Sequence, residues 1–111
     1  MHAIANAMTT TVEESWAVVE QFTTAIHDAA QSREWQQVLD LAGSRHQRLL
    51  SHFEQFPVGP DNAGFYQSRL GDMLGGERDL QRLATDARRE VMREGLLTNQ
   101  NYRAVNAYLS N

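Results

Sequence analysis

The strongest constraint on the fold is an apolar stripe that runs at helical spacing from residue 35 to residue 56. Its apolar side chains recur in steps of three and four, which places them on one side of a helix, with polar residues such as Asp40 and Glu54 toward water. The members of the stripe are Trp35, Val38, Leu39, Ala42, His46, Leu49, Leu50, Phe53 and Phe56. One helix cannot bury such a stripe alone, so the sequence predicts a helical bundle built around it.

Two further long helices are predicted, one on each side of this helix in the sequence. Thr11 and Glu14 have the spacing of a capping box and start a helix that ends near Gln31. Ser32 is expected to cap the helix of residues 35–56 after a short connection, which makes the first two helices antiparallel neighbours. Residues 57–62 hold both prolines of the chain and other turn formers, so a loop is expected there.

The third predicted helix, from about residue 62 to residue 94, contains the adjacent glycines Gly75 and Gly76. Two glycines cost about 2 kcal/mol of helix propensity relative to alanine, which favours a break. However, Met73, Leu80 and Ala87 keep a spacing of seven across the pair, and a loop would normally reset that register. We therefore expect one long helix, either straight or kinked at the two glycines.

A short final stripe completes the predicted fold. Gly95 is expected to stop the third helix, and Thr98 or Asn99 to cap a last one. The sequence thus predicts an all-α fold, a small antiparallel helical bundle of three long helices plus a short C-terminal helix. The 111 residues suffice for a single core, so residues 11–111 are predicted to form one domain after a tail, residues 1–10, that has no periodicity.

Composition bounds the surroundings and the partners of the chain. It has no cysteine, which excludes disulfides and thiolate chemistry. No apolar run approaches the roughly 20 residues of a membrane-spanning helix, and the first residues lack the pattern of a secretion signal. We expect a soluble, cytoplasmic protein without membrane contact. The net charge of −4 arises before Arg33, where all charged residues are acidic, so nucleic acid is not expected as a partner.

The side chains that could carry chemistry do not form a known catalytic or metal-binding pattern. None of the four histidines stands three residues after a glutamate or belongs to an HExxH pair, so neither a metal nor another cofactor is expected. Ser44 and His46 are too close along one helix to face each other, and no GxSxG turn or phosphate-binding loop occurs. We expect a binding protein, not an enzyme.

The apolar residues exceed what a bundle of this size can bury. Most aromatic side chains should fill the core, because each contributes on the order of 1.5–3 kcal/mol when fully buried. They cannot all be buried together with the methionines Met73 and Met92 and the tyrosines of the last helices. Some apolar surface should therefore remain for a partner.

Three segments of the chain resemble the FliT family of flagellar export chaperones, small four-helix cytosolic proteins of the type III export system. The resemblance runs from about residue 16 to residue 111 and covers most of the chain. Its residues are Trp35, Val38, Leu39, Arg45, Leu49, Leu50 and Phe53 in the second helix, Leu70, Met73, Leu74, Leu80 and Arg88 in the third, and the segment NYRAVNAYLSN at the end. The Gly75–Gly76 pair departs from the family pattern, in which an acidic or amide residue is expected.

The resemblance implies a chaperone that keeps the filament-cap protein FliD soluble before export. It also implies contacts with the export ATPase complex and with a flagellar master regulator, and so a role in flagellar gene expression. In the family, an apolar surface of the second and third helices holds the client and the last helix can cover it. By position, the partner-binding residues would be Leu50, Phe53, Met73, Leu80 and Leu83, and the autoinhibitory cover Tyr102, Val105 and Leu109. Removal of residues from Asn99 onward is then expected to strengthen client binding.

Other interpretations stay open. A regulatory helical adaptor that sequesters a transcription factor without an export role would need the same apolar surface. A metal- or ligand-binding bundle would need a buried polar cavity. A twofold copy of the chain could equally close an exposed stripe, so a homodimer is also an alternative.

Overall fold

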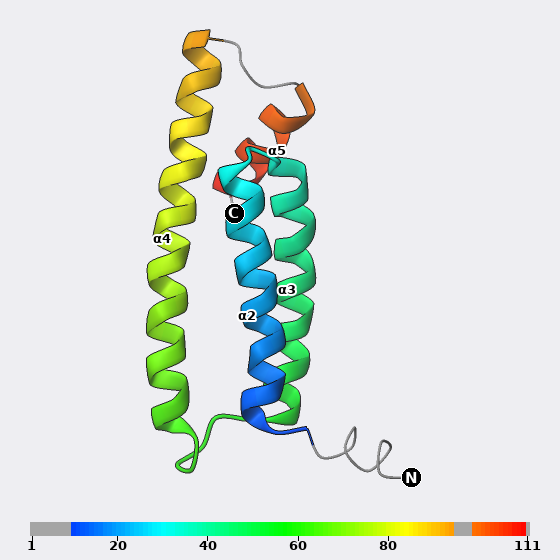
Figure 1. Ribbon diagram of the computed structural model, residues 1–111, viewed down its shortest axis with the longest axis vertical. Coiled ribbons are helices and arrows are strands. Elements are labelled where there is room, and N and C mark those ends of the chain that lie inside the picture. Colours follow the sequence, from blue (N-terminus) through cyan, green and yellow to red (C-terminus); the bar gives the residue numbers. More distant parts are fainter. Residues whose placement is uncertain (1–9, 95–98, 111) are drawn as a thin grey trace.

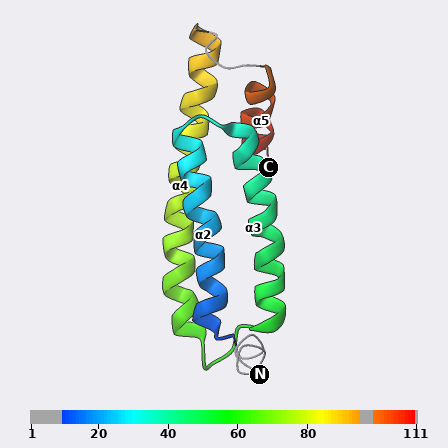
Figure 2. The same cartoon turned by 45° about the vertical axis from the view of Figure 1, so that its right-hand side comes forward.

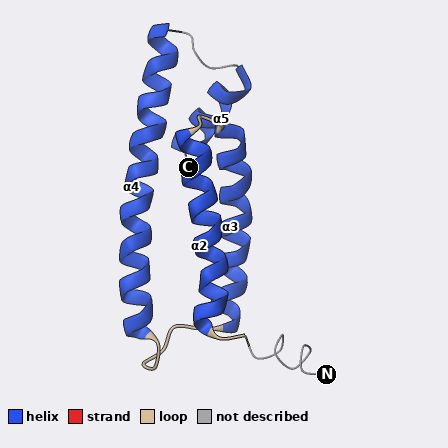
Figure 3. Ribbon diagram, in the orientation of Figure 1, coloured by secondary structure: helices blue, strands red, loops and turns tan. Residues whose placement is uncertain are grey.

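The computed structural model describes residues 10–94 and 99–110. Within these residues it contains four helices and no strand. Figure 3 colours these helices and the loops that join them. They are α2 (Val12–Gln31), α3 (Trp35–Gln55), α4 (Ala63–Glu94) and α5 (Asn99–Ser110). This confirms the predicted all-α bundle of three long helices and a short C-terminal helix. The predicted tail, apart from Thr10, and the predicted roles of Gly95 and Thr98 lie outside the described residues.

The hairpin of α2 and α3 begins as predicted but turns differently. The Thr11 hydroxyl accepts a hydrogen bond from the Glu14 amide at 3.1 Å and so caps α2. The expectation that Ser32 caps the next helix is wrong, because Ser32 is the C-terminal cap of α2. The cap of α3 is Glu34, whose side chain makes no capping bond.

A tight C-terminal turn of α2 explains this difference. The Glu34 amide donates to the Ala29 carbonyl at 2.9 Å, and the Arg33 amide donates to the Ala30 carbonyl at 3.1 Å. This pair of bonds is a Schellman motif, which requires a left-handed residue after the cap. Arg33 supplies it with a φ of 61°, so Ser32 is used to end α2 and is not free to start α3.

The four helices pack as a ring. α2 packs against α3 and α4, and α5 also packs against α3 and α4. In the described part of the chain, no Cα atom of α3 lies within 8 Å of one of α4, and the same is true of α2 and α5. The helices α3 and α4 are consecutive in sequence but therefore occupy opposite corners of the bundle.

The fourth corner of the ring is only partly filled. With 12 residues α5 is ~18 Å long, whereas the 21 residues of α3 span ~32 Å. Figures 1 and 2 show α5 beside only the upper part of the bundle. Beside it lies the larger core cluster, which includes Trp35, Leu80 and Val105. The lower half of the bundle has a smaller buried cluster of Trp16, Val19 and Tyr66.

The helix α4 passes through Gly75 and Gly76 without a break. A Cβ atom added at Gly75 would meet nothing within 4 Å, but one added at Gly76 would lie 3.1 Å from Nε2 of His27 on α2. Gly76 thus lets α2 and α4 approach closely at His27. This contact is a physical reason for one of the two glycines, and the structure gives none for the other.

The loop between α3 and α4 is tied together by side chains at both of its ends. The Asn62 side chain accepts from the Gly59 amide at 2.8 Å and donates to the Pro57 carbonyl at 3.0 Å. The Tyr66 hydroxyl donates to the Phe56 carbonyl at 2.9 Å. These bonds hold the predicted proline loop in one conformation as it crosses from one corner of the bundle to the opposite one.

Candidate partner-binding groove

A groove of about 660 Å³ lies between the diagonal helices α3 and α4, at the point where α5 ends. Its lining residues come from all three helices: Leu39, Ala42, Gly43, Arg45, His46, Leu49, Glu77, Gln81 and Tyr108. The groove exists because the ring arrangement holds α3 and α4 apart, and α5 fills the space between them only along its upper part. Tyr108 is the α5 residue of this lining, and the other lining residues belong to α3 and α4.

Helical spacing continues the groove into a row of exposed leucines. Leu50 follows the groove residue Gly43 by seven positions along α3, and Leu74 precedes Gln81 by seven along α4. Leu70 lies one turn before Leu74. Leu50 is 55% exposed, Leu70 is 37% exposed and Leu74 is 59% exposed. Such exposure is unusual for leucines that flank a core. We call this lower part, with Leu49, Leu50, Phe53, Leu70 and Leu74, the open groove.

A polar cluster marks the upper end of the open groove. Arg45 is buried and donates to the Glu77 carboxylate at 2.5 Å and to the Thr23 hydroxyl at 3.2 Å. The Tyr108 hydroxyl of α5 donates to the other Glu77 oxygen at 3.3 Å. Burial, together with the charge and the hydrogen bond of Glu77, raises the pKa of Tyr108 to about 12. This cluster therefore joins all four helices at the level where α5 stops.

A second buried polar chain lies under the lower half of the bundle. The Tyr66 hydroxyl donates to the Phe56 carbonyl, so its oxygen accepts from His52 Nε2 at 2.7 Å. The other ring nitrogen of His52 then accepts from the Ser15 hydroxyl at 2.8 Å. Burial and the nearby Arg48 charge lower the pKa of His52, which agrees with a neutral ring in this chain of bonds.

The Ser15–His52 pair has the contact of a nucleophile and its base, but it is closed to substrate. Both residues are 1% exposed, and Tyr66 on the other side of the ring is 2% exposed. The ring of Trp16 packs edge-on against His52 at 5.2 Å between centroids. The pair therefore fixes the relative positions of α2, α3 and α4 beneath the open groove.

The structure brings together some of the sequence-predicted partner-binding residues and separates others. Leu50 lies on the rim of the open groove, and Phe53 packs against the buried cluster beneath it. Met73 packs against the same cluster but lines a pocket between α2 and α4, away from the open groove. Leu80 is fully buried in the upper core. Leu83 lines a small pocket with Ala30, Gln31, Arg33 and Glu90 on the α2 side of α4. Leu80 and Leu83 therefore do not line the open groove.

The predicted cover residues belong to the upper core. Val105 is fully buried among Trp35, Val38 and Leu80, and Leu109 packs against the same cluster. Tyr102 is half-buried. These side chains lie above the open groove, so α5 closes its upper end and leaves its leucine-lined part uncovered.

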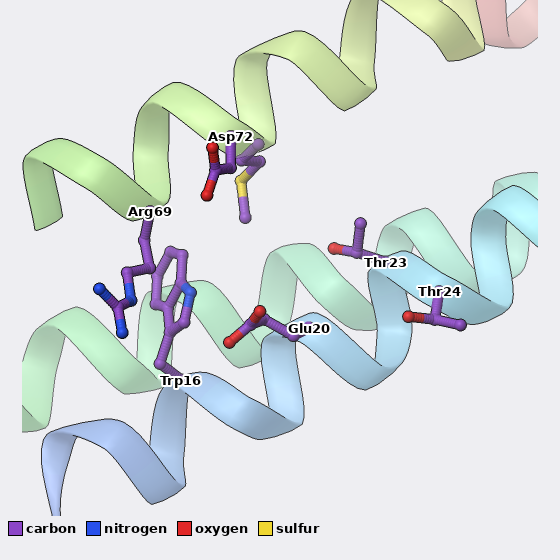
Figure 4. Close-up of a pocket in the computed structure, with 7 residues that line it drawn as sticks. Trp16, Glu20, Thr23, Thr24, Arg69 and Asp72 are labelled. Atoms are coloured by element: carbon purple, nitrogen blue, oxygen red, sulfur yellow. The ribbon is translucent and has the colours of Figure 1, made fainter.

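A smaller pocket of about 160 Å³ lies between α2 and α4. Figure 4 shows Trp16 pointing from α2 toward α4, with Glu20, Thr23 and Thr24 along α2 and Arg69 and Asp72 above them. Its walls carry both acidic and basic groups, and its base is the buried Trp16 ring. With about 160 Å³ it is too small for the helical segment that the exposed leucines suit.

No group of three or more histidine, aspartate and glutamate side chains in residues 10–94 and 99–110 could hold a metal ion. None of the described helices combines the length and the apolar character needed to cross a membrane.

Comparisons with protein-family models, curated proteins and solved structures gave no match.

The two polar clusters were not predicted from the sequence, and one histidine was predicted on the wrong side of its helix. It placed His46 in the apolar stripe, but His46 is exposed, whereas Arg45 and His52 are buried. Both follow Val38 at intervals of seven, which was the available signal. That spacing was not used because arginine and histidine are usually assigned to the water-facing side of a helix.

Proposed function

We propose that this chain is a chaperone of the flagellar type III export kind, which holds an amphipathic segment of the filament-cap protein FliD in the open groove. The observation that carries this proposal is the partly filled corner of the ring. Leu50, Leu70 and Leu74 are exposed there along two helices that α2 and α5 hold apart. The resemblance of the sequence to the FliT family supports the identity of the client.

The groove has the features of a site for a helix. Its lining runs along α3 from Leu39 to Leu49, and exposed leucines extend it downward on α3 and α4. The helices that form it are fixed by buried polar clusters. A client segment that contributes its own apolar stripe would complete the four-helix packing in the lower half of the bundle. Its own apolar side chains would then be kept from aggregating before export.

The test is a calorimetric titration of the full chain with the C-terminal segment of the filament-cap protein from the same genome. Leu74→Glu should weaken binding at least about tenfold, because it places a charge in an apolar contact that would otherwise lose water. Met92→Glu is the matched control, since Met92 is also exposed on α4 but lies beyond the groove. An equal effect of both substitutions, or no binding by the unaltered chain, would reject the proposal.

The same measurement separates the export role from the adaptor alternative. An export chaperone should bind the cap segment directly, and its deletion strain should secrete less cap protein. Normal cap export with altered flagellar gene expression in that strain would instead support a regulatory adaptor that uses this groove for a transcription factor.

A further inference from the structure

The end of α5 lies at the head of the open groove and gives that groove a direction. The last carbonyl groups of any helix lack partners within the helix and carry the negative end of its dipole. In the last turn of α5 no basic side chain offsets this charge. One bond is made locally, from the Ser110 hydroxyl to the Asn106 carbonyl at 2.8 Å.

The side chain of Glu77 adds a second negative group at the same level. Its carboxylate is bonded to Arg45 and Tyr108, but the two ions of the pair are buried unequally. The Arg45 side chain is 10% exposed and the Glu77 side chain is 33% exposed. The carboxylate is therefore the more accessible of the two ions to a segment bound in the groove.

The walls below Glu77 have the size and spacing of a helix site. Leu70, Leu74 and Glu77 follow one another at intervals of four and three along α4, and Leu50 and Phe53 are three apart on α3. From Arg45 to the end of α3 at Gln55 there are ten residues, which span ~15 Å. This length accommodates about three turns of helix.

We propose that the occupant of the open groove is a short amphipathic helix that continues the corner of α5, with its N-terminal end against Glu77 and the C-terminal end of α5. This inference rests on the proposed function and specifies how its client is bound. The N-terminal amides of the occupant supply donors and positive charge to the last carbonyl groups of α5 and to the exposed part of the Glu77 carboxylate. The reverse direction would bring two negative helix ends together. In this arrangement α5 stays in place.

The direction in which the helix lies in the open groove can be measured with a designed peptide and spin labels on the chain. The probe is a 14-residue peptide with leucines at positions 3, 6, 7, 10 and 13 and alanine and glutamine elsewhere, a spacing that forms one apolar face. The chain has no cysteine, so single labels can be attached at Ser110→Cys near the end of α5 and at Gln67→Cys near the lower end of α4. Both positions are exposed.

In nuclear magnetic resonance spectra of the bound peptide, the Ser110 label should broaden the N-terminal peptide residues and the Gln67 label the C-terminal ones. The α5 resonances should remain those of the packed helix. The opposite broadening pattern, release of α5, or absence of peptide binding would each overturn the inference.

A charge comparison tests the role of Glu77. The peptide with a free N-terminal amino group should bind about 3- to 10-fold more tightly than its acetylated form, because it adds a positive charge beside Glu77. Glu77→Gln should remove most of this difference, whereas Glu54→Gln, at an exposed acid near the lower end of α3, should preserve it. A difference in affinity that persists in Glu77→Gln would contradict the proposed contact. If that variant does not fold, the ratio of the two peptide affinities is measured in the unaltered chain at low and high salt. A charge contact requires this ratio to fall as the salt concentration rises.

The two proposals can fail separately. Binding of the designed peptide in the stated direction without binding of the cap segment would retain this inference and reject the client. Binding of the cap segment in the opposite direction, or with displacement of α5, would retain the client and reject this inference.

Discussion

The adjacent glycines of α4 allow a sharp test of the packing between α2 and α4. Gly75 and Gly76 are in one helix and differ in their surroundings, since only Gly76 faces His27. Glycine inside a helix costs about 0.8–1.0 kcal/mol relative to alanine. Gly75→Ala should therefore raise the free energy of unfolding by nearly this amount, which corresponds to an increase in Tm of about 3–6 °C for a chain of this size.

Gly76→Ala should raise the free energy of unfolding by less, because the new Cβ would lie 3.1 Å from Nε2 and 3.6 Å from Cε1 of His27. The histidine ring must move by a few tenths of an ångström, and the energy of that shift offsets part of the helix propensity. In a His27→Ala background the imidazole ring is absent. Gly76→Ala should then raise the free energy of unfolding by about as much as Gly75→Ala.

Urea and thermal unfolding, followed by helical circular dichroism, would measure these differences. Equal gains at the two positions in the unaltered chain would show that the His27 contact does not limit the approach of α2 and α4. A loss of stability on Gly75→Ala would refute the description of α4 as a regular helix through this pair.

Two further predictions concern the buried polar groups. Burial and the charge of Arg48 lower the pKa of His52 in the folded chain, so the unfolded chain binds a proton at this residue more readily. The urea midpoint of unfolding should therefore fall as the pH drops below about 6.5. His52→Gln should weaken this pH dependence and His46→Gln should keep it; the reverse pattern would exclude His52 as its source. Glu77→Ala should lower the free energy of unfolding by about 2–3 kcal/mol, less than for a fully buried pair because Glu77 is partly exposed. Replacing the pair together, as Arg45→Met with Glu77→Leu, should recover most of the loss in the same urea titration, and no recovery would argue against an unpaired Arg45 as the cause.

The helices were predictable from the sequence because their apolar residues keep one period over many turns. The register of Met73, Leu80 and Ala87 predicted a helix through two glycines, and the structure confirms it. The start of α2 was also predictable, since its cap uses a local bond between Thr11 and Glu14. Signals of this kind depend on neighbours within one helix.

The polar clusters could not be predicted in the same way, because their partners are distant in sequence. Glu77 interrupts the apolar register of α4, and only the structure shows that Arg45, 32 residues earlier, lies opposite it. The turn after α2 was mispredicted because a serine just before a helix is a common N-terminal cap. The choice was made by the left-handed conformation of Arg33, which its residue type does not signal.

The candidate site was predictable in part. The sequence indicated an apolar surface on the second and third helices, and Leu50 and Phe53 are at or beneath the open groove. The sequence did not indicate that α3 and α4 lie at opposite corners of the bundle. Leu70 and Leu74 are exposed in that arrangement, and Leu80 is buried. Which residues share a groove depends on helix order around the ring, and a single-helix pattern does not contain that order.

The loop of residues 57–62 acts as a spacer as well as a connection. Consecutive helices with a short link normally become neighbours, but this segment spans a diagonal and is held in shape by Asn62 and Tyr66. The loop therefore lets α3 and α4 occupy opposite corners, while α2 and α5, which pack against both, set the distance between them. A link too short to cross the diagonal would make α3 and α4 neighbours and would remove the groove, even with every groove residue unchanged.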